Sequence, residues 1–242
     1  MNRDYHRWHS PILGRDMELL VFGRSGARVL AFPPRLGRFF DYENWGVVYS
    51  LRRHIDEGWI QLFCLDSIDS VTLYGWWRHP RERIAHHELY ERYVLDEVLS
   101  FSGWINPCHF VTALGCSLGA YHAADIVLRH PHRFGKLVAL SGRYDLTRPV
   151  DQFGDLFDGY YDETIYLHTP CHFLPNLHDA WHLDAIRRLQ IIFAVGEEDP
   201  FRESNHQVSS TLWEKGAWNS LHLWQGRAHR ATDWRQMVSL YV

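Results

Sequence analysis

The stretch that decides the fold reads Phe110-Val-Thr-Ala-Leu-Gly-Cys-Ser-Leu-Gly-Ala-Tyr-His-Ala-Ala-Asp125. Its first five residues are mainly apolar and predict a strand, and the residues after Gly119 predict a helix that ends near Pro131. Between them lies G-x-S-x-G, and a strand–turn–helix around this motif is typical of a nucleophile elbow. The turn holds the serine in a strained backbone conformation, and both flanking residues are glycine because a side chain there would clash. Ser117 is therefore the candidate nucleophile.

The same turn predicts half of an oxyanion hole. The backbone N–H of Leu118 points to the same place as the serine hydroxyl, at the start of a helix whose dipole favours negative charge. A second N–H is expected from the loop Pro33-Pro34-Arg35-Leu36-Gly37, after a predicted strand at 27–32. Proline has no N–H, so Arg35 or Leu36 must donate. We favour Arg35.

Hydrophobic periodicity divides the remaining chain into alternating strands and helices. The predicted strands are 5–12, 16–22, 27–32, 60–65, 110–114, 137–140, 190–195 and 220–224. Besides the helix after the G-x-S-x-G motif, the predicted helices are 44–55, 80–101, 203–215 and 233–240. This alternation predicts an α/β fold, with a mainly parallel central sheet, an antiparallel N-terminal start and helices on both faces.

Length and composition favour one domain. The 242 residues contain no internal repeat or linker, and 46% hydrophobic residues are enough for a core. We interpret residues 1–242 as a single domain with a cap-like excursion at about 144–185, where aromatic, histidine and proline residues are frequent. This excursion is expected to shape a pocket.

Charge and targeting signals limit the partners. The net charge is −4 with histidine neutral, which gives no basic surface for nucleic acid or an anionic membrane. The N-terminal residues lack the apolar core of a signal peptide, and no apolar run approaches 18 residues. Four cysteines in a chain of this length do not form a disulfide framework. We predict a cytoplasmic protein that binds neither nucleic acid nor membrane, and a homo-oligomer remains open.

Two loops that follow strands supply partners for the serine. Gly196-Glu-Glu-Asp-Pro200 comes after the strand at 190–195, and Gly226-Arg-Ala-His229 comes after the last strand. The resulting order Ser117, Asp199, His229 is the one found with this elbow. His229 is expected to take the serine proton, and Asp199 to orient the imidazole and stabilise its charged form. Glu197 and Glu198 are alternatives to Asp199, which we favour because it precedes a proline where the side chain can turn inward.

Other groups of residues are less informative. The segment His87-Glu-Leu-Tyr-Glu91 lacks the second histidine of a metalloprotease helix. Four histidines, His168, His172, His178 and His182, recur at metal-like spacings around Cys171, but prolines break any shared helix. We therefore predict no metal at these histidines. Trp76, Trp77 and Tyr160 are candidates for the wall of a substrate pocket, with plain packing as the alternative.

At this point the chain resembles a known family, the esterase D-like branch of the α/β-hydrolases, which contains S-formylglutathione hydrolases, feruloyl esterases and mycolyltransferases. The resemblance covers nearly the whole chain. It rests on Asp16-Met-Glu-Leu-Leu-Val-Phe22, Gly37-Arg-Phe39, Gly115-Cys-Ser-Leu-Gly119 with Tyr121-His-Ala123, Asp158-Gly-Tyr-Tyr-Asp162, Phe173-Leu-Pro-Asn176 and Gly196-Glu197 with Asp199. It implies an α/β-hydrolase fold and hydrolysis of acyl esters without a metal or organic cofactor.

The chain departs from the family pattern at two places. The family histidine usually lies in a His-Asp-Trp run, whereas His229 is followed by Arg230 and Ala231, with Asp233-Trp234 further on. The second glycine that usually follows Ser-x-Gly is Ala120 here. Neither change removes a member of the predicted triad.

These residues lead to one function hypothesis and two alternatives. The first is a serine carboxylesterase that hydrolyses a small-molecule ester through an acyl-enzyme on Ser117. The second is an acyltransferase that uses the same triad. The third is a non-catalytic binding protein that has kept the hydrolase fold.

Overall fold

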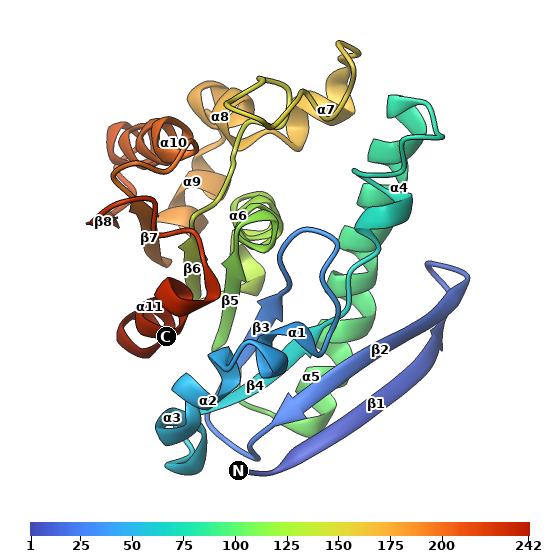
Figure 1. Cartoon of the computed structure of the whole chain (residues 1–242), viewed down its shortest axis with the longest axis vertical. Helices are drawn as coiled ribbons and strands as arrows, with labels where there is room; N and C mark the ends of the chain where they lie inside the picture. Colours follow the sequence, from blue (N-terminus) through green and yellow to red (C-terminus); the bar gives the residue numbers. More distant parts are fainter.

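The computed structural model describes residues 1–242, and an eight-stranded sheet runs through the middle of the molecule (Figure 1). Its strands are β1 (Arg3–Ser10), β2 (Arg15–Phe22), β3 (Ala27–Phe32), β4 (Ile60–Leu65), β5 (Val111–Cys116), β6 (Lys136–Leu140), β7 (Gln190–Gly196) and β8 (Asn219–Trp224). Their order is β1-β2-β4-β3-β5-β6-β7-β8. β2 is antiparallel to both β1 and β4, and all the other pairs are parallel. The predicted fold class is therefore confirmed.

Helices cover both faces of this sheet. They are α1 (Asp41–Asn44), α2 (Val47–Ser50), α3 (Arg52–Asp56), α4 (Pro80–Arg92), α5 (Leu99–Ile105), α6 (Leu118–Arg129), α7 (Glu163–Leu167), α8 (Pro170–Phe173), α9 (Ala180–Arg187), α10 (Arg202–Glu214) and α11 (Ala231–Tyr241). The 3-10 turns are η1 (Asp69–Val71), η3 (Pro131–Arg133) and η4 (Leu174–Asn176), and η2 (Tyr93–Val98) is a π-helical stretch between α4 and α5. None of the helices combines the length and apolar character that crossing a membrane requires.

Alternation along the strands divides the core into two layers. In β3, Leu30 and Phe32 pack into one layer, whereas Val29 and Ala31 pack into the other. The first layer is completed by α4, η2, α5, α6, α9 and α10, and the second by α1, α2, α3 and α11. Because the central strands are covered on both sides, they read in the sequence as continuous apolar runs.

One predicted helix is wrong. The segment 44–55 does not form one helix. It contains the last residue of α1 and then two separate short helices, α2 and α3. Gly46 has a φ of 71°, a left-handed conformation that ends the hydrogen-bond ladder of α1. The apolar residues Val47, Val48 and Leu51 are still buried against the sheet, so the pattern identified the buried face but not the break.

The predicted long helix over 80–101 is confirmed at its start. Pro80 is its first residue, and the His79 side chain accepts a hydrogen bond from the Arg81 N–H, which caps the helix. The helix continues through η2 and ends at Ile105.

The segment between β6 and β7 contains α7, α8, η4 and α9. In Figure 1 α8 lies beside α10, on the side of the sheet away from α11. Its description as a cap-like excursion from a single domain stays a prediction.

Candidate active site

The turn between β5 and α6 has the geometry that the G-x-S-x-G motif predicts. Ser117 has φ 56° and ψ −121°, a region that residues other than glycine rarely occupy. A Cβ at Gly115 would lie 1.9 Å from the Gly119 carbonyl oxygen, and a Cβ at Gly119 would lie 2.1 Å from the Phe32 carbonyl oxygen. Both glycines are therefore required by backbone that passes too close for any side chain.

The structure brings Ser117, His229 and Asp199 together. Ser117 Oγ lies 2.9 Å from His229 Nε2, and His229 Nδ1 lies 2.7 Å from Asp199 Oδ2. The other oxygen of Asp199 accepts a hydrogen bond from the Phe201 N–H, and its side chain is fully buried. Because the His229 Nδ1–H donates a hydrogen bond to the Asp199 carboxylate, Nε2 carries no proton and can accept the proton of the serine hydroxyl.

The two alternative carboxylates, Glu197 and Glu198, point elsewhere. Both side chains are exposed, and neither bonds to His229. Their backbone N–H groups instead donate to the carbonyl groups of Trp224 and Gly226, at 2.8 and 2.9 Å. Backbone hydrogen bonds therefore connect the acidic turn after β7 to the end of β8 and to the loop that carries His229.

That loop is held by residues to which the sequence patterns assigned no role in the site. Ala228 has a φ of 43°, and its carbonyl accepts a hydrogen bond from Ser141 Oγ at 3.1 Å. Trp234 Nε1 donates to the same hydroxyl at 3.2 Å, and the Trp234 ring lies 5.4 Å from the His229 ring. The tryptophan of the displaced Asp-Trp pair thus reaches the imidazole from the first turn of α11. Its presence in the sequence was a signal, but only the fold brings it to the site.

A second loop supplies candidate oxyanion donors. The Leu36 N–H donates to Asp69 Oδ2 at 2.9 Å, so it is already used. The other oxygen of Asp69 lies 3.0 Å from His122 Nε2, and both side chains are buried. The Arg35 N–H has no hydrogen-bond partner within the chain. Of the two donors left open by the sequence, Arg35 is therefore the free one.

A cavity of about 390 Å³ opens over Ser117 and His229. Its other lining residues include four arginines but no Asp or Glu. Ten of them lie on five loops: Pro34, Arg35, Tyr74, Arg143, Leu146, Gln152, Phe153, Phe201, Arg227 and Arg230. The other two, Leu118 and Trp234, lie on α6 and α11. The first part of the predicted excursion thus contributes to the wall of the cavity.

Trp76, Trp77 and Tyr160 do not line this cavity, which corrects the sequence-based expectation. Trp76 packs against the guanidinium of Arg83, 4.9 Å from its ring, and Trp77 is 68% exposed. The Tyr160 hydroxyl bonds to Arg81 and Asp162, away from the cavity. From the same tryptophan-containing loop it is Tyr74 that turns inward, so the pattern located the loop but not the residue.

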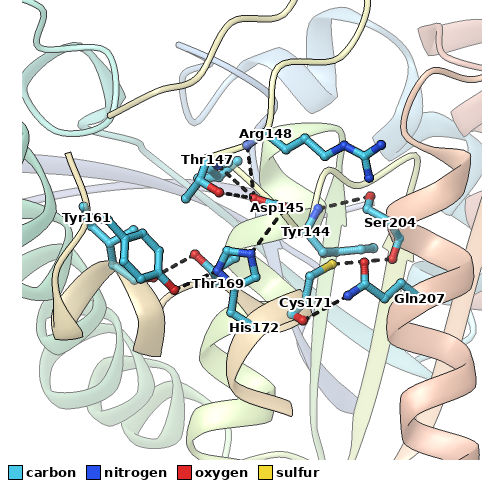
Figure 2. A network of polar contacts seen from close by, with 12 residues as sticks. Tyr144, Asp145, Thr147, Arg148, Tyr161, Thr169, Cys171, His172, Ser204 and Gln207 are labelled. Atoms are coloured by element: carbon cyan, nitrogen blue, oxygen red, sulfur yellow. Dashed lines mark hydrogen bonds and ion pairs between the residues drawn. The ribbon is translucent and has the colours of Figure 1, made fainter. Parts of the chain in front are cut away.

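The histidines considered as metal ligands are scattered. His172 bonds to the Tyr161 hydroxyl (Figure 2), and His182 Nε2 lies 2.7 Å from the Leu128 carbonyl. His168 lies instead in a buried group with Asp125 and His87, whose ligand-type atoms are all within 4.8 Å of one another. These three are the residues of the chain that are arranged closely enough to hold a metal ion.

Their protonation, however, favours an ion pair. His168 Nδ1 lies 2.7 Å from Asp125 Oδ2, and His87 Nε2 lies 3.4 Å from the same oxygen. Burial lowers the pKa of His168, but the charge of Asp125 and its hydrogen bond outweigh burial and raise that pKa to about 9. Burial lowers the pKa of His87 to about 4. At neutral pH, with no metal bound, His168 therefore carries a proton on each nitrogen, and a metal ion would have to displace one of these protons to bind.

Comparison with known proteins identifies the fold. No protein-family model matches the sequence, and no curated protein is similar enough in sequence to be matched. Among solved structures, a ferulic acid esterase superimposes with a TM-score of 0.76 at 13% identity, over 99% of this chain and 95% of the other. An S-formylglutathione hydrolase from Agrobacterium tumefaciens gives 0.76 at 16% identity, over 98% and 91%. An S-formylglutathione hydrolase from Staphylococcus aureus gives 0.69 at 16% identity, over 99% and 94%. The chain therefore has the α/β-hydrolase fold.

Proposed function

We propose that the protein is a serine carboxylesterase that hydrolyses small-molecule esters through an acyl-enzyme. The observation that carries this proposal is the chain of contacts from Ser117 Oγ through His229 to Asp199, at 2.9 and 2.7 Å, on the floor of an open cavity. A ferulic acid esterase and an S-formylglutathione hydrolase share the fold on which this triad is placed.

The proposed reaction begins with attack of Ser117 Oγ on the ester carbonyl carbon while His229 Nε2 takes the hydroxyl proton. The carbonyl oxygen becomes an oxyanion, which accepts hydrogen bonds from the backbone N–H groups of Leu118 and Arg35. When the tetrahedral intermediate collapses, the bond to the alcohol breaks and His229 gives its proton to the departing oxygen. Asp199 stabilises the imidazolium in both stages.

The second half of the reaction repeats these steps with water. His229 takes a proton from a water molecule, whose oxygen attacks the acyl carbon. The second intermediate releases the carboxylic acid, and the proton on His229 returns to Ser117 Oγ. No metal or organic cofactor has a part in this scheme. The four free cysteines fit a reducing compartment, and we expect the enzyme in the cytoplasm.

The test is hydrolysis of p-nitrophenyl acetate, butyrate and octanoate by the wild type and by Ser117→Ala. We expect turnover by the wild type and a loss of about 10⁴-fold or more in kcat for the variant. Addition of competing alcohols during turnover distinguishes hydrolysis from acyl transfer, because an acyltransferase would form new esters. Equal rates for wild type and variant would contradict the proposal.

A further inference from the structure

The cavity over Ser117 is cationic although the whole chain is not. Four arginines line it, Arg35, Arg143, Arg227 and Arg230, and no Asp or Glu does, whereas the net charge of the chain is −4. Charge of one sign on the wall of a concave site concentrates the electrostatic field there and attracts ligands of the opposite sign.

Arg143 is a buried cation without a carboxylate partner. It is 5% exposed, and its guanidinium donates to the backbone carbonyls of Asp145, Arg148 and Gly154 at 3.0, 2.8 and 2.8 Å. No carboxylate oxygen lies within ion-pair distance of it, and the Phe201 ring lies 5.9 Å away. Burial lowers the pKa of Arg143, but arginine keeps its proton in proteins. Backbone dipoles hold this charge in place without cancelling it.

The acids nearest to Arg143 are committed to other donors. Figure 2 shows the Asp145 carboxylate bonded to Thr147 and to the Arg148 N–H, with His172 Nε2 3.4 Å away. The carboxylate of Asp155 accepts hydrogen bonds from two backbone N–H groups at 2.7 Å. Both acids act on Arg143 through space and offset only part of its charge.

The other three arginines are weakly paired or unpaired. Arg35 forms no ion pair, and its guanidinium lies 5.8 Å from the ring of Tyr74. Arg227 is 3.6 Å from Asp151, and Arg230 is 3.5 Å from Asp233. Both pairs are long, and the side chains of both arginines are exposed to solvent, so these pairs contribute little. A ligand anion therefore competes with weak partners only.

Since the arginines share one cavity with Ser117, we propose that the preferred substrates are esters whose acyl or alcohol part carries an anionic group. This inference rests on the proposed esterase function. The planar guanidinium matches a carboxylate with two parallel hydrogen bonds, so a carboxylate is the smallest suitable anion. The anionic group is bound by the arginines while the ester carbonyl lies over Ser117.

Two matched pairs of esters test the inference. The acyl pair is mono-p-nitrophenyl glutarate and p-nitrophenyl valerate, which have acyl chains of equal length and differ by a carboxylate. The alcohol pair is 4-acetoxybenzoate and its methyl ester. Each kcat/KM is divided by the rate constant with hydroxide, which removes differences in intrinsic reactivity. In at least one pair we expect a preference of about tenfold or more for the anionic ester, the effect of one partly desolvated ion pair.

Substitution locates the preference. In Arg227→Gln and Arg230→Gln we expect the ratio of anionic to neutral kcat/KM to fall by about threefold or more, since each removes one charge at the mouth. Added NaCl should lower the ratio in the wild type because it screens exposed charges. The matched control is Arg92→Gln, an exposed arginine on α4 that does not line the cavity, which should leave the ratio unchanged.

The outcomes separate this inference from the proposed function. If wild type but not Ser117→Ala hydrolyses the neutral esters and neither pair shows a preference for the anion, the inference is wrong and the esterase function stands. A preference that is insensitive to salt and to both arginine substitutions would also overturn it. If none of the four esters is hydrolysed, both proposals fail.

Discussion

Ser117 adopts a strained backbone conformation in a turn so tight that the positions two residues before and after it, 115 and 119, have room only for glycine. The predicted elbow, the order of Ser117, Asp199 and His229, and the free Arg35 N–H all follow from short segments placed after strands. Asp69 and His122, by contrast, could not be predicted as partners, because they lie 53 residues apart and meet only through the sheet order. Trp234 was visible in the sequence, but its contact with His229 depends on where α11 begins.

A prediction at this scale concerns Gly119. In Gly119→Ala the new methyl group would meet the Phe32 and Pro33 carbonyl oxygens, at 2.1 and 2.6 Å from its ideal position. Because these atoms belong to the backbone, α6 must shift away from β3. We expect a loss of about 2–3 kcal/mol in the free energy of unfolding, measured by urea denaturation.

The control for this variant is Gly154→Ala. An added Cβ at Gly154 has no heavy atom within 4 Å, and its φ is not in the left-handed region. Its stability should stay within about 0.5 kcal/mol of the wild type. Equal losses for the two variants would show that the tight approach of α6 to β3 does not exist in solution.

At the scale of elements, the oxyanion loop depends on a contact with η1. Asp69, the first residue of η1, accepts the Leu36 N–H and faces His122 on α6, so it joins the loop after β3 to the helix that carries the serine. Asp69 touches no reacting atom and is a positioning residue. Removal of its carboxylate frees the Leu36 N–H and allows the Arg35 N–H to move.

We therefore predict that Asp69→Ala lowers kcat for a neutral p-nitrophenyl ester by about 10- to 100-fold. This decrease is smaller than the decrease in kcat that follows complete removal of an oxyanion donor. KM should change by less than about threefold, because ground-state binding does not use the oxyanion donors. Asp69→Asn, which keeps an oxygen acceptor for Leu36, should recover most of kcat. A change confined to KM, or equal losses in both variants, would contradict this role.

The elements themselves were largely predictable. The six parallel strands were identified because buried parallel strands are short apolar runs, and the first two strands because their residues alternate. The long helix was predicted over 80–101 because Pro80 marks its start, and it extends to Ile105. The helix predicted at 44–55 failed at Gly46, whose left-handed conformation is one of several that glycine adopts with similar ease. The short helices α7 to α9 were missed because helices of this length are stabilised mainly by packing, of α7 against α4, of α8 against α6 and α10, and of α9 against η3.

At the scale of the whole molecule, a buried ion pair fastens the segment between β6 and β7 to the body. His168 lies before α8 and pairs with Asp125 on α6, while His87 on α4 lies against the same carboxylate. Glu88 is 3.9 Å from the other nitrogen of His168, and Arg129 adds a positive charge nearby. No sequence pattern joined these residues, since they come from three separate elements.

This cluster predicts how stability depends on pH. The pKa of His168 rises from 6.5 to about 9 on folding, so between these values the native state holds a proton that the unfolded chain has lost. Its stabilisation is complete below pH 6.5 and is lost as pH rises through 9. The pKa of His87 falls from 6.5 to about 4 on folding. Below pH 6.5 the unfolded chain therefore binds a proton that the native state does not bind, and the stability of the native state falls. The cluster therefore favours the folded state most near pH 6.5.

Urea denaturation from pH 5 to 9.5 measures this dependence. On the alkaline side the slope contributed by His168 is at most about 1.4 kcal/mol per pH unit. The double variant Asp125→Asn/His168→Gln replaces the charged pair by neutral groups of similar size and should lose this part of the slope. The control is His109→Gln, an exposed histidine outside the cluster, which should keep the slope. An unchanged slope in the double variant would rule out the ion pair.

The central claim is that Ser117 is a nucleophile activated by His229, and reaction with a fluorophosphonate probe tests it most directly. We expect the wild type to take up one probe per chain, with the added mass located on the peptide that contains Ser117. Ser117→Ala should take up none, and His229→Ala should react at least about 100-fold more slowly because the serine then has no base. A wild-type protein that does not react, or a probe found on another residue, would contradict the account.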